Sequence, residues 1–166
     1  MPVEKDNSGV KLERAVQVGI VVRDLERSTG LLTKIFGIGP FHFIEWPNRP
    51  ESKYFFRGRR ERIKIRQAFV QLGALELELI QPLEGENNAY RQFLDERGEG
   101  IHHILFETQD MDGTVSLVKE QGVEVLQNGD GIRPGTRWAL LDTQALVGFL
   151  VELRHRPGDS DGASIS

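Results

Sequence analysis

The chain contains no cysteine among its 166 residues. This absence excludes disulfide bonds, zinc sites built on thiolates and a cysteine nucleophile. Any metal ion must therefore be bound by oxygen and imidazole nitrogen ligands alone. The length favours one domain, or two small halves that share a core, and a chain of this size can bury enough apolar surface without covalent cross-links.

Long apolar runs are also missing from the sequence. No stretch approaches the roughly eighteen apolar residues of a membrane span, and the N-terminal segment MPVEKDNSGVKLER has no apolar run typical of a secretion signal. The formal net charge is −4, with acidic and basic residues interspersed, which gives no electrostatic footprint for nucleic acid. We therefore predict a cytoplasmic protein that binds neither membranes nor nucleic acid.

The ends of the chain differ in composition from its middle. The last residues, RPGDSDGASIS, are rich in proline, glycine and serine, a composition typical of disorder. The sequence predicts a flexible N-terminus over residues 1–13, one domain over 14–155 and a disordered tail over 156–166. Within the domain we expect two modules, at about 14–82 and 100–155.

The first half of the domain begins with a buried strand, AVQVGIVV, at residues 15–22. A helix follows, with Asp24 as N-cap and Gly37 as its end. Three strands come next, one at about 40–46 and two in RIKIRQAFVQLGALELELIQP that meet at a turn. The order of elements in this half is therefore βαβββ.

The second half repeats that order after a short helix at about 89–96. The segment at 101–108 reads as a strand, MDGTVSLVKEQG as a helix, and VEVLQNG, TRWALLD and VGFLVELRH as three further strands. Gln17 and His103 differ by 86 residues, and so do Asp24 and Asp110 (103 − 17 and 110 − 24). We interpret the chain as an α+β fold built from paired βαβββ modules. The alternative is two unrelated α+β units with coincidental spacing.

Four polar residues occupy the strand face that lies opposite the predicted helices. Alternate residues of a strand point to opposite faces, so the apolar residues of each strand identify the helix side. Gln17 and Glu78 then lie on the other face in the first half, and His103 and Glu152 in the second. Carboxylates on an enclosed face are costly unless they are paired or bind a metal. The four residues therefore predict a site for one divalent ion such as Zn, Ni, Co, Mn or Fe(II).

Several of these residues also have simpler interpretations. Glu78 and Glu152 could point to solvent from half-exposed antiparallel strands. His102 shares a face with apolar neighbours and is expected to be a core histidine, and His42 is expected to be structural. The connection over residues 47–62 is rich in arginine and is either a lid that binds a phosphate or carboxylate, or a solvated basic loop.

Residues 14–155 resemble the glyoxalase/bleomycin-resistance/dioxygenase superfamily, whose members are also called vicinal-oxygen-chelate proteins. The strongest part is ELIQPLEGENNAYRQFLDERGEGIHHILFET, which is similar to methylmalonyl-CoA epimerases, and GEGIHHI before a strand is fairly specific to that branch. The resemblance implies a cupped, mixed or antiparallel sheet around the metal, with ligands at Gln17, Glu78, His103 and Glu152. It also implies a homodimer.

The sequence departs from the epimerases at three places. LDTQALVG stands where they have a His-Pro-Lys turn, and Gln67 falls where they often have a second carboxylate base. The amide side chain of Gln67 cannot accept a substrate proton as a carboxylate base would. The set of Gln17, Glu78, His103 and Glu152 is also more similar to that of zinc glyoxalase I enzymes than to the His-first set of the epimerases. Because both imidazoles required by extradiol dioxygenases are replaced by oxygen ligands, oxygen activation is disfavoured.

The resemblance implies an enzyme, a metal-dependent isomerase or epimerase that moves a proton α to a carbonyl or CoA thioester through a metal-stabilised enediolate. Its partner would be a small carbonyl or acyl-CoA substrate. By analogy Glu152 is the predicted base, with Glu78 as the alternative. Two other functions stay open: a glyoxalase I-type lactoylglutathione lyase, and a resistance protein that sequesters a ligand without catalysis.

Overall fold

The structure, a computed structural model, describes residues 9–158. Its elements, in chain order, are β1 (Ala15–Val21), α1 (Leu25–Phe36), β2 (His42–Trp46), β3 (Tyr54–Phe56), β4 (Arg59–Arg60), β5 (Lys64–Leu72), β6 (Leu75–Glu84), α2 (Ala89–Arg97), β7 (Gly100–Glu107), α3 (Met111–Glu120), β8 (Val125–Asp130), β9 (Arg137–Leu141), α4 (Gln144–Val147) and β10 (Leu150–His155).

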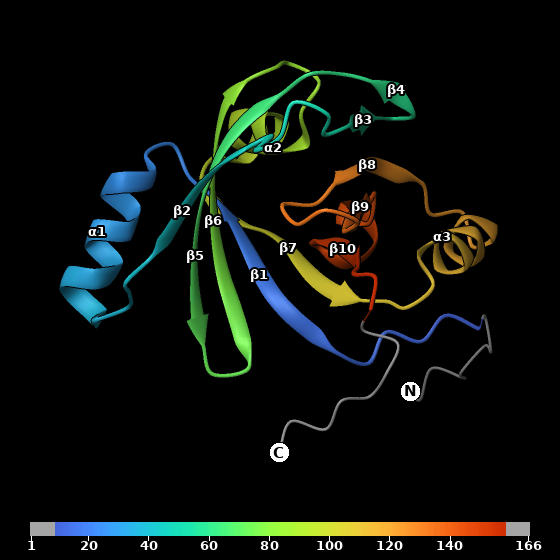
Figure 1. The fold of residues 1–166 in the computed structure, drawn as a ribbon, viewed down its shortest axis with the longest axis horizontal. Coiled ribbons are helices and arrows are strands. Elements are labelled where there is room, and N and C mark those ends of the chain that lie inside the picture. Colours follow the sequence, from blue (N-terminus) through green and yellow to red (C-terminus); the bar gives the residue numbers. More distant parts are fainter. Residues whose placement is uncertain (1–8, 159–166) are drawn as a thin grey trace.

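All ten of these strands belong to one sheet with the order β2-β5-β6-β1-β7-β10-β9-β8-β3-β4. The two modules meet at β1 and β7, which pair antiparallel. On either side of this seam the arrangement repeats, since β6 pairs parallel with β1 and β10 pairs parallel with β7. Figure 1 shows how strongly this sheet curves. The α+β class, the βαβββ repeat and the cupped mixed sheet predicted from the sequence are confirmed.

The outer face of the sheet is covered by one helix in each module, and Figure 1 shows α1 and α3 at opposite sides of the molecule. Leu25 of α1 is fully buried against Val22 and Leu79. In the second module Met111 of α3 packs against Leu153 of β10. Complete burial of one such side chain contributes about 1.5–3 kcal/mol, so each helix is held mainly by its apolar stripe. The helix side predicted from the alternation of residues is therefore confirmed for Val22, Leu79 and Leu153.

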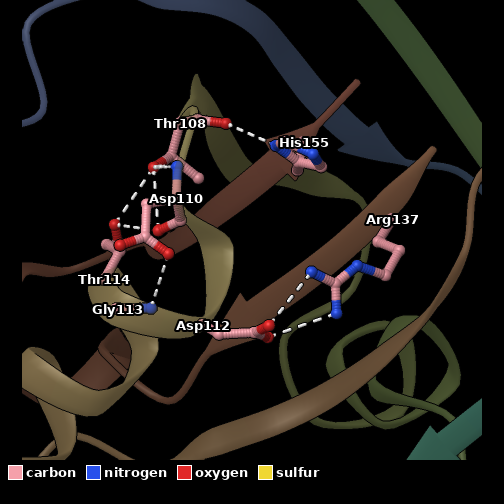
Figure 2. Close-up of polar contacts among 7 residues, drawn as sticks. All are labelled: Thr108, Asp110, Asp112, Gly113, Thr114, Arg137 and His155. Atoms are coloured by element: carbon pink, nitrogen blue, oxygen red, sulfur yellow. Dashed lines mark hydrogen bonds and ion pairs between the residues drawn. The ribbon is translucent and has the colours of Figure 1, made fainter. Parts of the chain in front are cut away.

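Polar caps fix where α3 begins. The Asp110 carboxylate accepts a hydrogen bond from the Gly113 amide at 2.9 Å, and the hydroxyl of Thr114 donates to the Asp110 carbonyl. His155, at the end of β10, contacts the carbonyl of Thr108 at the end of β7, as Figure 2 shows. These contacts join the start of α3 to the two strands that carry the second half of the site. Asp24 caps α1 in the same way, by accepting from the amide of Arg27.

The inner, concave face holds the largest apolar cluster. It is built from both modules, with Val21, Ile80, Leu140 and Leu150 among its buried members. Helix α2 contributes Tyr90 to the same cluster. One end of the cup is therefore filled by apolar side chains and the polar residues of the concave face lie toward the other end.

The connection over residues 47–62 is more regular than a loop, although its arginines at positions 57, 59, 60 and 62 are exposed, as the interpretation of a solvated basic segment predicted. It forms the hairpin β3–β4, which pairs antiparallel with β8 and so extends the sheet of the second module. Tyr54 and Phe56 are buried in the main cluster, and this apolar anchor explains why the segment is ordered along the sheet edge. The short helix α4 in LDTQALVG is a second element that the sequence interpretation did not include.

The predicted flexible N-terminus falls partly, at residues 1–8, outside the described residues, and so does part of the predicted tail, at 159–166. Within the described part, Leu12 packs against the cluster beneath α3. The boundaries at 14 and 155 stay predictions. No helix of the described chain is long and apolar enough to cross a membrane.

Candidate active site

His103 lies at the centre of the seam between the two modules and is completely buried. Its partner across the antiparallel β1–β7 ladder is Gly19. A side-chain carbon on Gly19 would lie only 2.0 Å from His103 Cε1 and 2.3 Å from Nε2, so the imidazole occupies the space above this glycine. Glycine inside an apolar strand often marks such a close approach. The glycine in AVQVGIVV was a signal for this contact that the sequence interpretation missed.

Three oxygen atoms converge on the Nε2 atom of His103. They belong to Glu152, at 3.0 Å, to Glu78, at 3.2 Å, and to the amide of Gln17, at 3.4 Å. The strand register explains the meeting, because Glu78 pairs with Gly19 in β1 and Glu152 pairs with the residue two beyond His103 in β7. The structure thus brings together all four residues that the sequence predicted as ligands.

Neighbouring amides and carboxylates orient two of these side chains. The Gln17 amide nitrogen donates to Glu76 at 2.7 Å, which leaves its oxygen facing His103. Gln67, on the adjacent strand β5, donates through its amide nitrogen to Glu78. These two hydrogen bonds hold the side-chain oxygens of Gln17 and Glu78 in place. Glu76 was not predicted as a site residue, although its alternation with Glu78 in LELELI places both on one face.

Burial and the neighbouring charges together set the pKa values of the cluster. It raises the pKa of Glu152 to about 7, and the charge of Glu78 adds to this, while His103 and Arg154 oppose it. Burial alone would lower the pKa of His103, but the two carboxylates outweigh it and the net pKa is raised. The site therefore favours positive charge at its centre, because its negative groups are removed from water.

His102 completes the imidazole pair, at a register shift in the pairing of β7 with β1. It is fully buried between Tyr90 and Phe93 of α2, as the sequence predicted for a core histidine. Burial, followed by the charge on His103, lowers its pKa well below the usual value, so it is neutral. Its Nδ1 atom lies 3.0 Å from His103 Nδ1. A hydrogen bond at this distance fixes the ring of His103 with Nε2 toward the three oxygens.

A cavity of about 540 Å³ opens above the cluster and is lined by Gln17, Gln67, Glu78 and Glu152. This volume is typical of sites for small ligands. Trp46 and Trp138 line it and also pack on the main cluster. His42, which was expected to be structural, is exposed and borders the cavity.

The sequence interpretation did not identify the arginines that line the cavity. The arginines of the 47–62 connection that the sequence singled out do not line it. Instead Arg133 and Arg154 of the second module do, together with Arg156, which follows its last strand. Arg49 holds the turn that carries Arg133, since its guanidinium donates to the carbonyl of Ile132 at 2.6 Å. The fold brings Arg133, far from the other two in sequence, to the same cavity.

The residues present fit a divalent ion in their chemistry and spacing. Ligand atoms about 2.1 Å from one ion lie roughly 3.0–3.4 Å from each other, which is the range of the contacts around His103 Nε2. That nitrogen can donate at most one hydrogen to three oxygens, and Glu152 Oε2 makes no hydrogen bond within residues 9–158. However, no group of three or more His, Cys, Asp or Glu side chains in this range forms a ready metal-binding arrangement. The metal therefore stays a proposal.

Comparisons with known proteins agree with this architecture. Residues 16–139 match the family model of the Glyoxalase/Bleomycin resistance protein/Dioxygenase superfamily. A Streptomyces coelicolor methylmalonyl-CoA epimerase, solved with 2-nitronate-propionyl-CoA, is 28% identical, with a TM-score of 0.66 over 89% of this chain and 99% of that one.

Two further relatives are more distant in sequence. The Mycobacterium tuberculosis methylmalonyl-CoA epimerase is 23% identical over 89% of this chain and 91% of its own, with a TM-score of 0.65, and supports the fold alone. The uncharacterised Bacillus subtilis protein YqjC is 25% identical over 89% of this chain and 96% of its own length. With two βαβββ modules closed around a buried polar centre, and with the family model matching most of its length, the chain belongs to the glyoxalase/bleomycin resistance protein/dioxygenase superfamily.

Proposed function

We propose that this protein is a metal-dependent isomerase or epimerase that moves a proton on the carbon next to a carbonyl or CoA thioester. The observation that carries the proposal is the convergence of Gln17, Glu78 and Glu152 on His103 Nε2 at the floor of the cavity. The likeness to methylmalonyl-CoA epimerases, at 28% identity, supports an acyl-CoA substrate.

Gln17, Glu78, His103 and Glu152 would hold the ion. A divalent ion bound there would supply positive charge that stabilises the negative charge developing on the substrate carbonyl oxygen. His103 is fixed for this role by the neutral His102, and Gln17 by Glu76. The four residues come from four strands of one sheet, which keeps their positions rigid.

Glu152 is the proposed base. Its carboxylate takes the proton as the C–H bond breaks, and the electron pair of that bond moves toward the carbonyl. In the metal-free protein, burial raises the pKa of this carboxylate to about 7, so the enclosed site favours proton uptake by Glu152. Glu78 is the alternative base, since it faces the same cavity.

The positive part of the cavity lining suits an anionic substrate. Arg133, Arg154 and Arg156 line it, and Arg154 is braced by Glu107 at 2.8 Å. Guanidinium groups bind phosphate and carboxylate oxygens well. They would hold the phosphates of an acyl-CoA while the acyl group reaches the cluster at the floor.

Metal analysis tests the site. We expect the purified wild type to contain or bind one divalent ion per chain, and the His103→Ala and Glu152→Ala variants to lose it. Zn²⁺, Ni²⁺ and Co²⁺ should each be tried by calorimetry after chelation. Wild-type metal content that is retained unchanged in both variants would exclude this site.

Exchange of a substrate proton with deuterated solvent tests the reaction. We expect metal-loaded enzyme to exchange the α-proton of an acyl-CoA, and Glu152→Gln to exchange it at least about 100-fold more slowly. Exchange with the thiohemiacetal of glutathione, but with no acyl-CoA, would favour the glyoxalase-type lyase. Ligand binding without exchange or metal would favour the sequestering protein. The homodimer and the cytoplasmic location stay predictions.

A further inference from the structure

A second open cavity lies beside α3, on the outer face of the second module. Its volume is about 600 Å³, close to the 540 Å³ of the active-site cavity and typical of sites for small ligands. None of the four candidate ligands of the metal lines it, and of the described residues Trp138 alone lines both cavities. We call this second space the outer cavity.

The outer cavity lies where the sheet of the second module extends beyond its helix. The hairpin β3–β4 continues the sheet past β8, whereas Met111 of α3 packs with Ala139 and Leu153 on β9 and β10. Tyr54 and Phe56 are buried in the main cluster, so Phe55 between them faces the outer side. Helix α3 and the hairpin segment therefore form two walls, and β8 and β9 form the floor.

Apolar side chains make up a large part of the lining. They come from both walls and the floor and include Phe55, Met111, Val115, Val125 and Ala139. Phe55, Val115 and Val125 are only half-buried, so they keep apolar surface that a ligand can cover. Covering such surface favours binding of a ligand with a hydrocarbon body.

The polar part of the lining contains two lysines that no acidic side chain neutralises. Lys53 directly precedes β3 and Lys119 lies in the last turn of α3, so they come from opposite walls. Neither ammonium group has an ion pair or hydrogen bond within residues 9–158. Two of the carboxylates are already engaged, since Asp112 pairs with Arg137, as Figure 2 shows, and Asp130 accepts a hydrogen bond from the Lys53 amide at 2.8 Å.

The remaining charged residues of the lining are Arg57 and Glu124. Arg57 lies 3.7 Å from Asp142, which is not part of the lining. The lining thus carries four cationic and three anionic side chains, a formal charge of +1 (4 − 3). Its available charge favours an anion over a cation of the same shape.

We propose that the outer cavity is a second ligand site, for a small organic anion with an apolar body such as a carboxylate on a hydrocarbon chain. The hydrocarbon covers Phe55 and Val115, and the carboxylate pairs with Lys53 or Lys119. The site is independent of the metal and of the proton transfer proposed above, because it shares no candidate ligand or base with them.

Two native side chains report on the two cavities separately in NMR spectra. Met111 lines the outer cavity alone, and the sequence has one other methionine, so its isotope-labelled methyl group gives a signal that is simple to assign. Trp46 lines the active-site cavity alone and supplies one of the two indole N–H signals. The probes are octanoate, octanol and octylammonium, which share a chain and differ in charge.

We expect octanoate to shift the Met111 signal with a dissociation constant of about 5 mM or lower, and the Trp46 signal to stay in place over that range. Octanol and octylammonium should bind at least about 3-fold more weakly, and the difference should shrink at high salt because the lysines are exposed.

Charge reversal tests the two lysines. Lys53→Glu and Lys119→Glu should each weaken octanoate binding by about 2- to 10-fold at low salt. Lys34→Glu is the matched control, because Lys34 occupies the last turn of α1 as Lys119 does in α3 and does not line the outer cavity. It should bind octanoate as the wild type does.

Four outcomes would overturn the proposal. They are an unmoved Met111 signal, equal affinity for the three probes, equal weakening by Lys34→Glu and Lys119→Glu, and a response of Trp46 before Met111, which would place the anion in the active-site cavity. A Met111 signal that moves with protein concentration alone would show that a second copy occupies the cavity, and this too would overturn the ligand site. None of these results bears on proton exchange at the active-site cavity.

Discussion

Gly19 offers the sharpest perturbation of the candidate site, because its lack of a side chain makes room for His103. In Gly19→Ala the new methyl carbon would lie 2.0 Å from His103 Cε1, where ordinary contacts begin at 3.4 Å. The ring must therefore move by about 1.4 Å (3.4 − 2.0). It is fully buried, with His102 Nδ1 at 3.0 Å on one side and the Glu152 and Glu78 carboxylates near its Nε2 atom.

A shift of this size acts on both stability and metal binding. Overpacking of a closed core costs typically about 1–3 kcal/mol, and we expect the free energy of unfolding of the metal-free protein to fall by that amount. The distances from Nε2 to the surrounding oxygens are 3.0–3.4 Å, so displacement of the ring would separate the four ligands. We expect the affinity for Zn²⁺ or Co²⁺ to fall by about 10- to 100-fold or more.

Urea denaturation and calorimetric metal titration measure the two effects. Gly100→Ala is a matched control, since its new carbon on the neighbouring strand would meet only Phe93 at 3.9 Å. The double variant Gly19→Ala, His103→Ala removes the clash, so Gly19→Ala should cost much less in the His103→Ala background than in the wild type. Equal cost in both backgrounds would refute the reasoning, and so would a Gly19→Ala protein that binds metal and unfolds as the wild type does.

Three further predictions concern other parts of the site and the fold. Because burial raises the pKa of Glu152 from 4.5 to about 7, and the pKa of His103 is also raised, the folded metal-free protein holds protons more tightly than the unfolded chain. Its unfolding free energy should therefore fall as the pH rises from about 4.5 through about 7, and Glu152→Gln should flatten this dependence in urea titrations. Arg133→Ala should raise the KM for an acyl-CoA by about 3- to 10-fold with little change in kcat, as measured by steady-state kinetics. Asp110→Ala removes the cap of α3 and should lower stability by about 1 kcal/mol in thermal or urea denaturation.

Each of these has a result that would contradict it. A metal-free protein that becomes more stable between pH 5 and 7 would show that the buried carboxylate is not protonated there. An Arg133→Ala variant with an unchanged KM would place the anionic part of the substrate elsewhere. An Asp110→Ala protein as stable as the wild type would mean that the hydrogen bond to Gly113 contributes nothing net.

The sequence by itself determined the repeated βαβββ order and the side of the sheet on which the candidate ligands lie. Alternation with period two and the caps at Asp24 and Asp110 are local properties, so they are readable without a structure. The same alternation placed Gln17, Glu78, His103 and Glu152 on the concave face, and the structure brings them together. His102 was also expected to be a core histidine, and it is buried.

Only the tertiary structure decided what surrounds these residues. The register between distant strands places Gly19 under His103 and brings Gln67 beside Glu78, and no local pattern encodes a register between segments far apart in the chain. The same holds for the hairpin β3–β4, which leaves its own module to pair with β8. It also holds for the cavity arginines, which come from the second module and the residue after its last strand rather than from the arginine-rich connection. Local chemistry therefore identified the candidate ligands, whereas long-range strand pairing decided how they are packed, oriented and approached by a substrate.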